Sequence, residues 1–444
     1  MIHRRNFLTR TAGALGALAV APAPLLADRL ARMSTLLDTL DADLLALGAA
    51  ADPARLAEDE PFWARVREAF ALDPAVVNLD HGWTNPAPRE AMADLVRLAR
   101  EVQSLPAHWL ARLWPEVTDT TVRAALAEAM GAPGKQIALV RNATEALDTV
   151  LLGVPLRAGD EVVCSAHDYY AMLDALEQRR ARDGVVLRML RPPVPAPSLE
   201  RLAEMYEAAI GPRTKLVLLT HPSNLTGQLL PVRRIAAAAH AVGAEVVVDG
   251  AQSLGLLEEP VAALDCDYYG ASAHKWLGVP VGTGVLWMRP EHAAKVWPLI
   301  PSPPETAGMS RFEWIGTSPE YVAPAALPAL AIHRTLGAAR KAERLRYLTS
   351  YWRTRAAATL PEARFYTTDG AAMGLGLCTV ELPGVESKAL EARLLERHGI
   401  LVQAMSGNAR TPEIRGIRVS PNVYTSPAEL DRLVRALVAV AAAR

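Results

Sequence analysis

The chain has 444 residues, 51% of them hydrophobic, which is enough to bury a large core and too long for one simple domain. Its 47 basic and 48 acidic residues leave a formal net charge of −1 without a long block of either sign, so the positive field that a nucleic-acid partner requires is missing. The three cysteines, Cys164, Cys266 and Cys378, are widely spaced, which argues against a disulfide framework and against a cysteine metal site.

The first 27 residues have the layout of a twin-arginine signal peptide. Arg4 and Arg5 precede a short segment rich in alanine, glycine and leucine that ends in small residues, and cleavage fits after Ala23 or after Ala27. The alternative is an ordinary amphipathic start. The segment is too short and too rich in alanine for a stable membrane anchor. From the signal layout, we expect the twin-arginine export machinery to deliver the folded protein to the bacterial periplasm.

The next part of the chain changes from helical to alternating elements. Residues 28–75 are charged and predicted to be helical, and they end in the irregular stretch "DPAVVNLDHGWTNPAP". Beyond it, apolar runs without polar alternation are typical of strands buried on both faces, and amphipathic helices separate them. We expect strands at 136–140, 161–165, 185–190, 215–221, 245–250, 267–271 and 283–288, and helices from about 143 and at 170–182, 199–210 and 231–242.

This alternation predicts an α/β domain with a mostly parallel sheet over residues 76–320. A long helical stretch is expected at 322–359. The remainder completes a smaller α+β domain over residues 321–444. Its predicted elements are strands in "GLCTVEL", "ILVQAM" and "GIRVSP" and helices at 386–398 and 427–442.

One lysine lies in the glycine-rich stretch "GASAHKWLGVPVGTG". It is Lys275, one of only six lysines among the 47 basic residues, so arginine is the usual choice where charge alone is needed. A partly desolvated amine loses proton affinity and can then form a Schiff base, which a guanidinium cannot. From this stretch alone, a surface lysine and a nucleophile are equally good interpretations.

Polar segments follow several of the predicted strands. In a parallel sheet, ligands bind outside the carboxyl ends of the strands, so these segments are expected to meet at one edge. They are "RNATEA", "SAHDYY", "HPSNLTG", "DGAQS" and "SAHK". Each is a weak signal by itself, and together they predict a site.

Individual residues in these segments have both plain and chemical interpretations. Asp249 ends an apolar strand, where it could cap a helix or pair with the pyridine nitrogen of a cofactor, and Gln252 follows three residues later. Thr144, followed by Glu145, lies at a probable helix start, where a hydroxyl and backbone amides form an anion site or simply a cap. His167 could stack on a cofactor ring or be a polar loop histidine.

The ordered series of these residues resembles class V aminotransferase-fold enzymes. It consists of Thr144–Glu145, His167, Asn224, Asp249 with Gln252, Ser272 with His274 and Lys275, and Arg418. Enzymes of that family use pyridoxal 5'-phosphate (PLP) and have the fold of type I PLP-dependent transferases. The resemblance covers roughly residues 76–444 and is nearest to the isopenicillin N epimerase-like group, with cysteine desulfurases and kynureninases as relatives.

The resemblance implies a cofactor site. By it, Lys275 carries PLP as a Schiff base, Asp249 pairs with the pyridine nitrogen and Gln252 with the phenolic oxygen, near Asn224. The implied phosphate ligands are the amide of Ala143, Thr144, Ser272 and His274, with Thr317 contributed by a second subunit of a homodimer.

The resemblance also implies a substrate site. Arg418 is expected to clamp the α-carboxylate, with Asn224 as a further neighbour. The loop "NLDHGWTNPAP" is expected to place His81, Trp83 and Asn85 near the substrate, although Trp-Thr-Asn replaces the small residues of the relatives. His167 is our choice for the side chain that stacks on the ring, with Tyr169 and Tyr170 as alternatives.

The expected reaction begins with an amino group bound at the cofactor, after which the amine of Lys275 acts as the base at Cα. Return of the proton to the opposite face of Cα gives epimerisation, return to the cofactor gives transamination, and loss of a substituent gives a lyase. Because "LVQAMSGNARTPEIRG" has no cysteine, persulfide transfer of the desulfurase kind is not expected. The alternatives are an exported enzyme that tailors an amino-acid residue of a secreted metabolite, as in siderophore maturation, and a catalytically silent binding protein of the same fold.

Overall fold

The buried apolar runs of the sequence form one seven-stranded sheet, in the order β2-β8-β7-β6-β5-β3-β4. The computed structural model describes residues 37–44, 46, 52–368, 370 and 374–443. The strands are β2 (Ile137–Val140), β3 (Glu161–Ser165), β4 (Val186–Leu190), β5 (Thr214–Thr220), β6 (Glu245–Asp249), β7 (Tyr268–Ser272) and β8 (Gly284–Met288). Five neighbouring strands run parallel, and β8 runs antiparallel to both β7 and β2, so the predicted mostly parallel sheet is confirmed.

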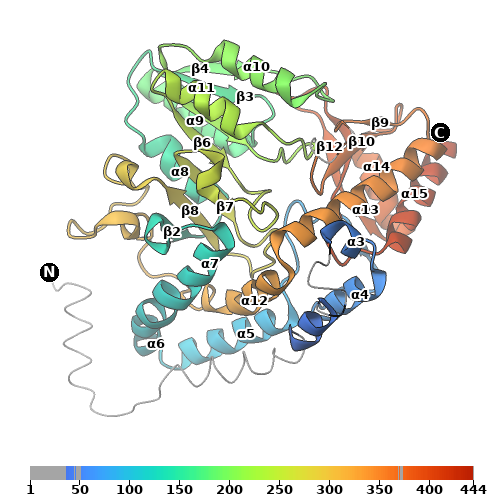
Figure 1. The fold of residues 1–444 in the computed structure, drawn as a ribbon, viewed down its shortest axis with the longest axis horizontal. Helices are drawn as coiled ribbons and strands as arrows, with labels where there is room; N and C mark the ends of the chain where they lie inside the picture. Colours follow the sequence, from blue (N-terminus) through green and yellow to red (C-terminus); the bar gives the residue numbers. More distant parts are fainter. Residues whose placement is uncertain (1–36, 45, 47–51, 369, 371–373, 444) are drawn as a thin grey trace.

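Helices cover both faces of this sheet (Figure 1). Leu216 and Leu218 of β5 pack toward α8 (Ala143–Gly153) and α9 (Tyr170–Asp183). Val217 and Leu219, which alternate with them, pack in the other core with α10, α11, α7 and α12. Those helices are α10 (Leu199–Ala209), α11 (Val232–Ala241), α7 (Arg123–Met130) and α12 (Leu327–Leu336). Because both faces of the central strands are covered, these strands are mostly apolar, whereas the edge strand β4 is only partly buried and contains Arg188.

The segment before the sheet is helical along a stretch where the sequence predicted no element. It contains α5 (Arg89–Ser104), α6 (Pro106–Leu113), the π-helix η1 (Trp114–Val122), α7 and the 3₁₀ turn η2 (Gly134–Gln136). In α5, Ala91, Leu98 and Val102 are buried, and their spacing is that of one helical face. Earlier in the chain are α3 (Pro53–Leu56), α4 (Glu60–Glu68) and β1 (Val77–Asn78).

The C-terminal part forms a second, smaller sheet, at the right of Figure 1, in the order β12-β13-β10-β9. Its strands are β9 (Arg364–Phe365), β10 (Cys378–Glu381), β12 (Gln403–Ser406) and β13 (Arg415–Val419), and β11 (Ile400–Leu401) pairs with β1. The helices are α13 (Ala338–Thr359), α14 (Ser387–His398) and α15 (Pro427–Ala442). Short 3₁₀ turns complete the described elements: η3 (Val261–Leu264), η4 (Pro290–His292), η5 (Gly308–Phe312) and η6 (Pro324–Ala326).

Two expected elements of this part are each divided in the structure. The predicted helix over 322–359 is η6, α12 and α13, because Gly337 adopts φ 75°, a left-handed value that ends one helix before the next begins. The single strand expected in "ILVQAM" is β11 followed by β12. Each half pairs with a different sheet, so the chain crosses from one to the other within this short stretch.

Arg344 of α13 joins the beginning and the end of the described chain. Its guanidinium is fully buried and forms an ion pair with Glu60 of α4. It also donates to the carbonyl oxygens of Ala57, Val423 and Thr425 at 2.7 to 3.0 Å. Within the described residues, no helix combines the length and apolar character that crossing a bilayer requires. The predicted signal peptide, residues 1–27, lies outside the described residues.

Candidate active site

The predicted site residues meet at the carboxyl ends of the parallel strands. Asp249 and Ser272 are the last residues of β6 and β7, and His167 follows β3 by two positions. Asn224 lies in the turn after β5. The sheet therefore brings together residues that are more than a hundred positions apart, as the strand order requires.

The start of α8 has the features expected of an anion-binding site. The cap of this helix is Asn142, whose Oδ1 accepts from the backbone N–H of Glu145 at 2.9 Å. Thr144 is therefore free of the capping role and lies one residue inside the helix. The N–H of Ala143 donates to Oγ of Ser272 at 2.8 Å, which joins two of the predicted phosphate ligands. Backbone amides at such an end attract anions.

A glycine permits this close approach between helix and sheet. A Cβ on Gly284, the first residue of β8, would lie 2.7 Å from Cα of Asn142 and 2.8 Å from the carbonyl oxygen of Ala271. A larger residue would push the strand away from the start of α8. Gly284, at the end of the stretch around Lys275, thus serves the packing of the site.

Lys275 lies in the turn after β7, partly buried and within electrostatic reach of Asp249. Burial lowers the pKa of the Lys275 amine to about 8, and the carboxylate of Asp249 partly opposes this shift. Asp249 is 2% exposed, its Oδ1 accepts from the N–H of Ala251 at 3.0 Å, and burial raises the pKa of its carboxyl group. The amine is therefore far easier to deprotonate than an ordinary lysine, so the nucleophile interpretation is favoured over a surface lysine.

Gln252 is buried between two other parts of the site. Its amide nitrogen donates to the carbonyl oxygen of Gly82 at 2.8 Å, and its carbonyl oxygen accepts from Nε1 of Trp276 at 2.9 Å. One of its two amide hydrogens remains for a ligand, whereas the sequence assigned the side chain to the cofactor alone. Gln252 thus also holds the loop of residues 79–85 against the segment that carries Lys275.

Arg418, on β13, is buried and already has a carboxylate partner. Its Nη2 donates to Oδ1 of Asp80 at 2.7 Å, and its Nη1 donates to the backbone oxygen of Asn224 at 3.0 Å. Burial raises the pKa of Asp80, while Arg418 opposes the shift. A Cβ on Gly82 would lie 2.4 Å from Cδ2 of Leu377 and 3.1 Å from Cζ of Arg418, so a larger residue would displace a neighbouring side chain.

Two atoms of this cluster are buried without a hydrogen-bond partner. They are Nε of Arg418 and Oδ1 of Asn224. Buried polar atoms of this kind are rare in folded proteins and are commonly satisfied by a ligand. Nε is the edge of the guanidinium that Asp80 and Asn224 leave open, and a second carboxylate can bind there.

His81, which the sequence placed near the substrate, packs in the interior. It is 1% exposed, its ring lies edge-on to Tyr424 at 5.6 Å between ring centroids, and burial lowers its pKa to about 3. Asn85 donates from its side chain to the His81 carbonyl oxygen at 3.1 Å. Trp83, by contrast, is 66% exposed. The imidazole of His81 is therefore neutral, its Nδ1 is buried without a hydrogen-bond partner, and its predicted place near the substrate stays a prediction.

The residues proposed to stack on a cofactor ring differ in their surroundings. His167 is buried, and its Nε2 lies 3.1 Å from Oε1 of Glu413. The rings of Tyr169 and Tyr170 contact each other at 4.5 Å between centroids, and Tyr170 is 60% exposed. In the described residues His167 contacts Glu413 of the small domain directly, while Tyr169 interacts electrostatically with Arg418 of the same domain.

Thr317, predicted to reach the site of a second subunit, is exposed between η5 and η6. No hydrogen bond or ion pair of the described residues joins it to the cluster around Lys275. Its role as a phosphate ligand therefore stays a prediction that needs a second copy of the chain.

Three residues that belong to this region were missed by sequence reasoning. Asp80 pairs with Arg418 across 338 positions, and Glu413 meets His167 across 246. Lys341 is the third: it is 5% exposed, and its Nζ donates to the carbonyl oxygen of Trp276, next to Lys275. None has a local sequence signal, because each owes its position to contacts between distant segments. For Lys341, the scarcity of lysine was the available hint.

The comparisons with known proteins identify the family. The class V aminotransferase profile matches residues 77–433. Isopenicillin N epimerase of Streptomyces clavuligerus is 32% identical over 397 residues, which cover 85% of this chain and 98% of the relative. A cysteine desulfurase of Synechococcus elongatus is 38% identical over 160 residues, 35% of this chain and 25% of the relative.

Solved structures show the same fold. A lysine-to-alanine mutant of C-DES, with glycine covalently linked to its PLP cofactor, superimposes with a TM-score of 0.73 at 23% identity, covering 84% of this chain and 98% of that one. The fold and the site define a PLP-dependent enzyme of fold type I. The chain belongs to the class V aminotransferase family.

The residues present fit PLP. Three groups that suit PLP lie at one edge of the sheet. An amine with a lowered pKa suits the cofactor's carbonyl group, a buried carboxylate suits its pyridine nitrogen, and a helix start suits its phosphate. Nδ1 of His274, a predicted phosphate ligand, is buried without a partner, and burial lowers the pKa of this imidazole to about 4. Lys275 would hold the cofactor aldehyde, Asp249 the ring nitrogen, and Thr144, Ser272 and His274 the phosphate.

Lys341 provides a test of the electrostatics around Lys275. Its Nζ also lies 3.3 Å from Nδ1 of His333, and it lines a cavity of about 30 Å³ together with Lys275. A neutral amine has two N–H donors for the Trp276 oxygen and the His333 nitrogen. Burial lowers the pKa of Lys341 to about 7, so the neutral form is favoured in the folded protein at alkaline pH.

We expect the free energy of unfolding to rise between pH 7 and pH 9.5, and Lys341→Met to reduce that rise by on the order of 2 kcal/mol. The sign follows because the unfolded chain, with an ordinary lysine pKa, binds a proton across this range that the folded protein has released. Urea denaturation of the holoenzyme at both pH values measures the effect. The control is Lys388→Met, at an exposed lysine of α14. Equal pH dependence in both variants would contradict the neutral buried amine.

Proposed function

We propose that this enzyme removes and returns the proton at the α-carbon of an amino acid or of a peptide-borne amino group, with epimerisation as the outcome. The observation that carries the proposal is the partly buried Lys275 amine beside Asp249, with its pKa lowered to about 8. The likeness to isopenicillin N epimerase over 98% of that relative's length supports the choice of reaction.

Each residue of the site has a task in this reaction. PLP, when bound, withdraws electrons from the α-carbon and so makes its proton acidic. The amine of Lys275 takes that proton, since its lowered pKa keeps a useful fraction in the neutral form at neutral pH. Asp249, buried at the end of β6, would pair with the ring nitrogen and stabilise its protonated form.

Arg418 and Asn224 orient the substrate. The open Nε edge of Arg418 is suited to the α-carboxylate, and Oδ1 of Asn224 can accept from a substrate N–H. The bond from Arg418 to Asp80 fixes the guanidinium plane before substrate arrives, which lowers the entropy cost of binding.

Persulfide transfer is not proposed, because a reactive thiol is not found where the reaction would need it. Cys164, Cys266 and Cys378 are all buried. Burial raises the pKa of the Cys164 and Cys266 thiols, which makes them poor nucleophiles. The segment before Arg418, where the family resemblance places the desulfurase cysteine, contains Glu413 and no cysteine.

We further propose that the enzyme works as a homodimer in which Thr317 of each subunit contributes to the phosphate site of the other. The exposure of Thr317 in the single chain supports this arrangement, because a residue that reaches a partner must lie at the surface.

The reaction is tested with a panel of α-deuterated amino acids and short peptides. We expect loss of the deuterium together with recovery of the compound in the opposite configuration, and we expect Lys275→Ala to slow this exchange by about 10³-fold or more. Nuclear magnetic resonance follows the deuterium, and chiral chromatography identifies the product. Lys388→Ala, at an exposed lysine, should exchange like the unchanged enzyme.

Other products would replace the proposal in a defined way. A keto acid would indicate transamination, and loss of a β or γ substituent would indicate a lyase. Tight binding of a panel compound without any loss of deuterium would favour a catalytically silent binding protein. Exchange that persists in Lys275→Ala would contradict the role of Lys275.

We also propose that the protein is exported folded through the twin-arginine route and modifies an amino-acid residue of a secreted metabolite, as in siderophore maturation. The support is the Arg4–Arg5 pair and the small-residue segment after it. Such a route suits an enzyme that must bind its cofactor before it leaves the cytoplasm.

The double substitution Arg4→Lys with Arg5→Lys should leave most of the protein in the cytoplasm, since the paired arginines are the recognised feature of the signal. Immunoblots of periplasmic and cytoplasmic fractions measure the distribution. Arg10→Lys, outside the pair, is the control and should be exported normally. An unchanged periplasmic fraction in the double variant would exclude this route.

A further inference from the structure

The loop between β12 and β13 reaches from the small domain to the large domain. Nη2 of Arg410 donates to Oδ1 of Asp174 on α9 at 2.7 Å, and Nη1 of Arg191 donates to the Arg410 carbonyl oxygen at 2.5 Å. The third contact is between Glu413 and His167, with 3.1 Å from Oε1 to Nε2. Three polar contacts therefore tie this loop, residues 407–414, to the part of the chain that carries the cofactor site.

The loop has an internal structure that fixes the position of Glu413. The side chain of Asn408 accepts from the backbone N–H groups of Arg410 and Thr411, at 2.7 and 3.0 Å. Thr411 and Ile414 are buried on either side of Glu413, whereas the Glu413 side chain is 39% exposed. Glu413 is thus held in position by a hydrogen-bonded turn and by its buried neighbours Thr411 and Ile414.

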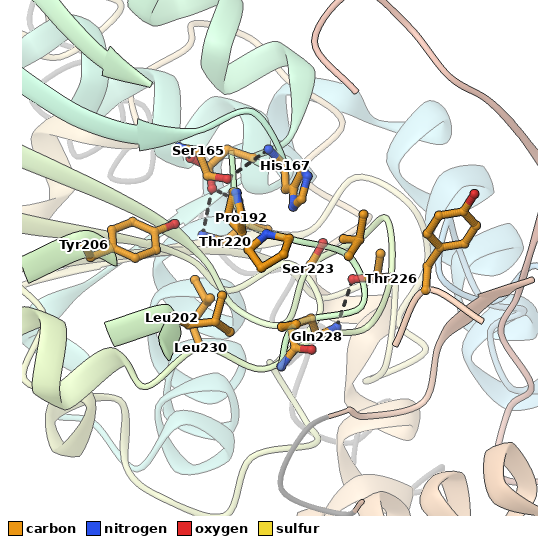
Figure 2. Close-up of a pocket in the computed structure, with 15 residues that line it drawn as sticks. Ser165, His167, Pro192, Leu202, Tyr206, Thr220, Ser223, Thr226, Gln228 and Leu230 are labelled. Atoms are coloured by element: carbon orange, nitrogen blue, oxygen red, sulfur yellow. Dashed lines mark hydrogen bonds between the residues drawn. The ribbon is translucent and has the colours of Figure 1, made fainter. Parts of the chain in front are cut away.

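His167 is equally constrained on its own side. The backbone N–H of His167 donates to Oγ of Ser165 at 3.0 Å, and the His167 side chain is 10% exposed. Figure 2 shows it at the edge of a cavity of about 30 Å³, with Ser165 and Tyr206 among the lining residues. The charged groups around it are Glu413, Arg191 and the neighbouring Asp168.

The contact fixes which ring nitrogen of His167 carries the proton. Burial lowers the pKa of His167, and Glu413 opposes the shift only in part, so the imidazole is neutral at neutral pH. An ionised carboxylate is only an acceptor, so Nε2 must donate its hydrogen to Glu413 and Nδ1 keeps its lone pair.

We propose that Glu413 is a positioning residue of the active site, which holds the imidazole plane and the Nε2–H tautomer of His167 toward the bound cofactor. The proposal rests on the proposed function and on the prediction that His167 lies against PLP. Glu413 lies in the loop that precedes the strand of Arg418. This loop therefore connects that strand to the large domain and also orients His167. Substrate binding at Arg418 and orientation at His167 are thereby coupled through one short segment.

Three variants separate positioning from docking of the loop. Glu413→Gln keeps an oxygen acceptor and removes the charge, Glu413→Ala removes both, and Arg410→Ala releases the loop from Asp174 without touching His167. The imidazole ¹⁵N chemical shifts of the full-length holoenzyme report the tautomer, and the His167 signals are assigned by their loss in His167→Gln. Deuterium exchange of an active panel compound is measured in parallel.

We expect Glu413→Ala to give a mixed tautomer at His167 and an exchange rate about 10- to 100-fold lower, as misplacement of a site residue commonly does. Glu413→Gln should retain the Nε2–H tautomer and most of the rate, and Arg410→Ala should retain the tautomer. The proposal is overturned if Glu413→Ala leaves the His167 shifts unchanged, or if Arg410→Ala alters the tautomer as strongly. Absence of exchange in the unchanged enzyme would instead overturn the proposed function, because the His167 shifts are read independently of turnover.

Discussion

The site depends on one amine that is kept among apolar groups, that of Lys275. Desolvation makes this amine easy to deprotonate, and the carboxylate of Asp249 keeps the shift moderate, with a pKa of about 8. Several other features of the chain support this placement. The parallel strands bring Asp249 and Ser272 to one edge, Gly284 lets the sheet approach α8, and Lys341 holds the backbone carbonyl of Trp276.

The second constraint is the connection between the two sheets. The loop of residues 79–85 links them: Asp80 binds Arg418 of the small domain, and the carbonyl of Gly82 accepts from Gln252 of the large domain. The loop of residues 407–414 makes a similar link from the other side through Glu413 and His167. The half of the site that would bind a carboxylate and the half that would bind PLP are therefore held in register by polar contacts, of which those of Asp80 and Gln252 are buried. Such contacts are costly unless fully paired, which favours one arrangement of the two halves.

The parts that could be predicted from sequence are those with a local or periodic signal. Continuous Val and Leu runs indicated the sheet, and strand ends indicated the rim with Lys275, Asp249 and Thr144. No local pattern indicated that Arg418 binds Asp80, since that pairing depends on the approach of two segments far apart in the chain. His81 was placed near the substrate by resemblance, and that role stays a prediction; its edge-on contact with Tyr424 depends on distant segments and had no local signal. The end of a helix at Gly337 had a visible signal, the glycine itself. The division of the strand in "ILVQAM" had none, because it depends on which sheet each half joins.

The central claim is that Lys275, among six lysines, is the one that binds PLP. Borohydride reduction of the purified holoenzyme fixes the bound cofactor to its lysine, and mass spectrometry of a proteolytic digest locates it. We predict a phosphopyridoxyl group on the peptide that contains Lys275 and on no other. A phosphopyridoxyl group on the peptide of Lys341, the buried lysine beside this turn, would contradict the assignment. The absence of the group from every lysine peptide would contradict it as well.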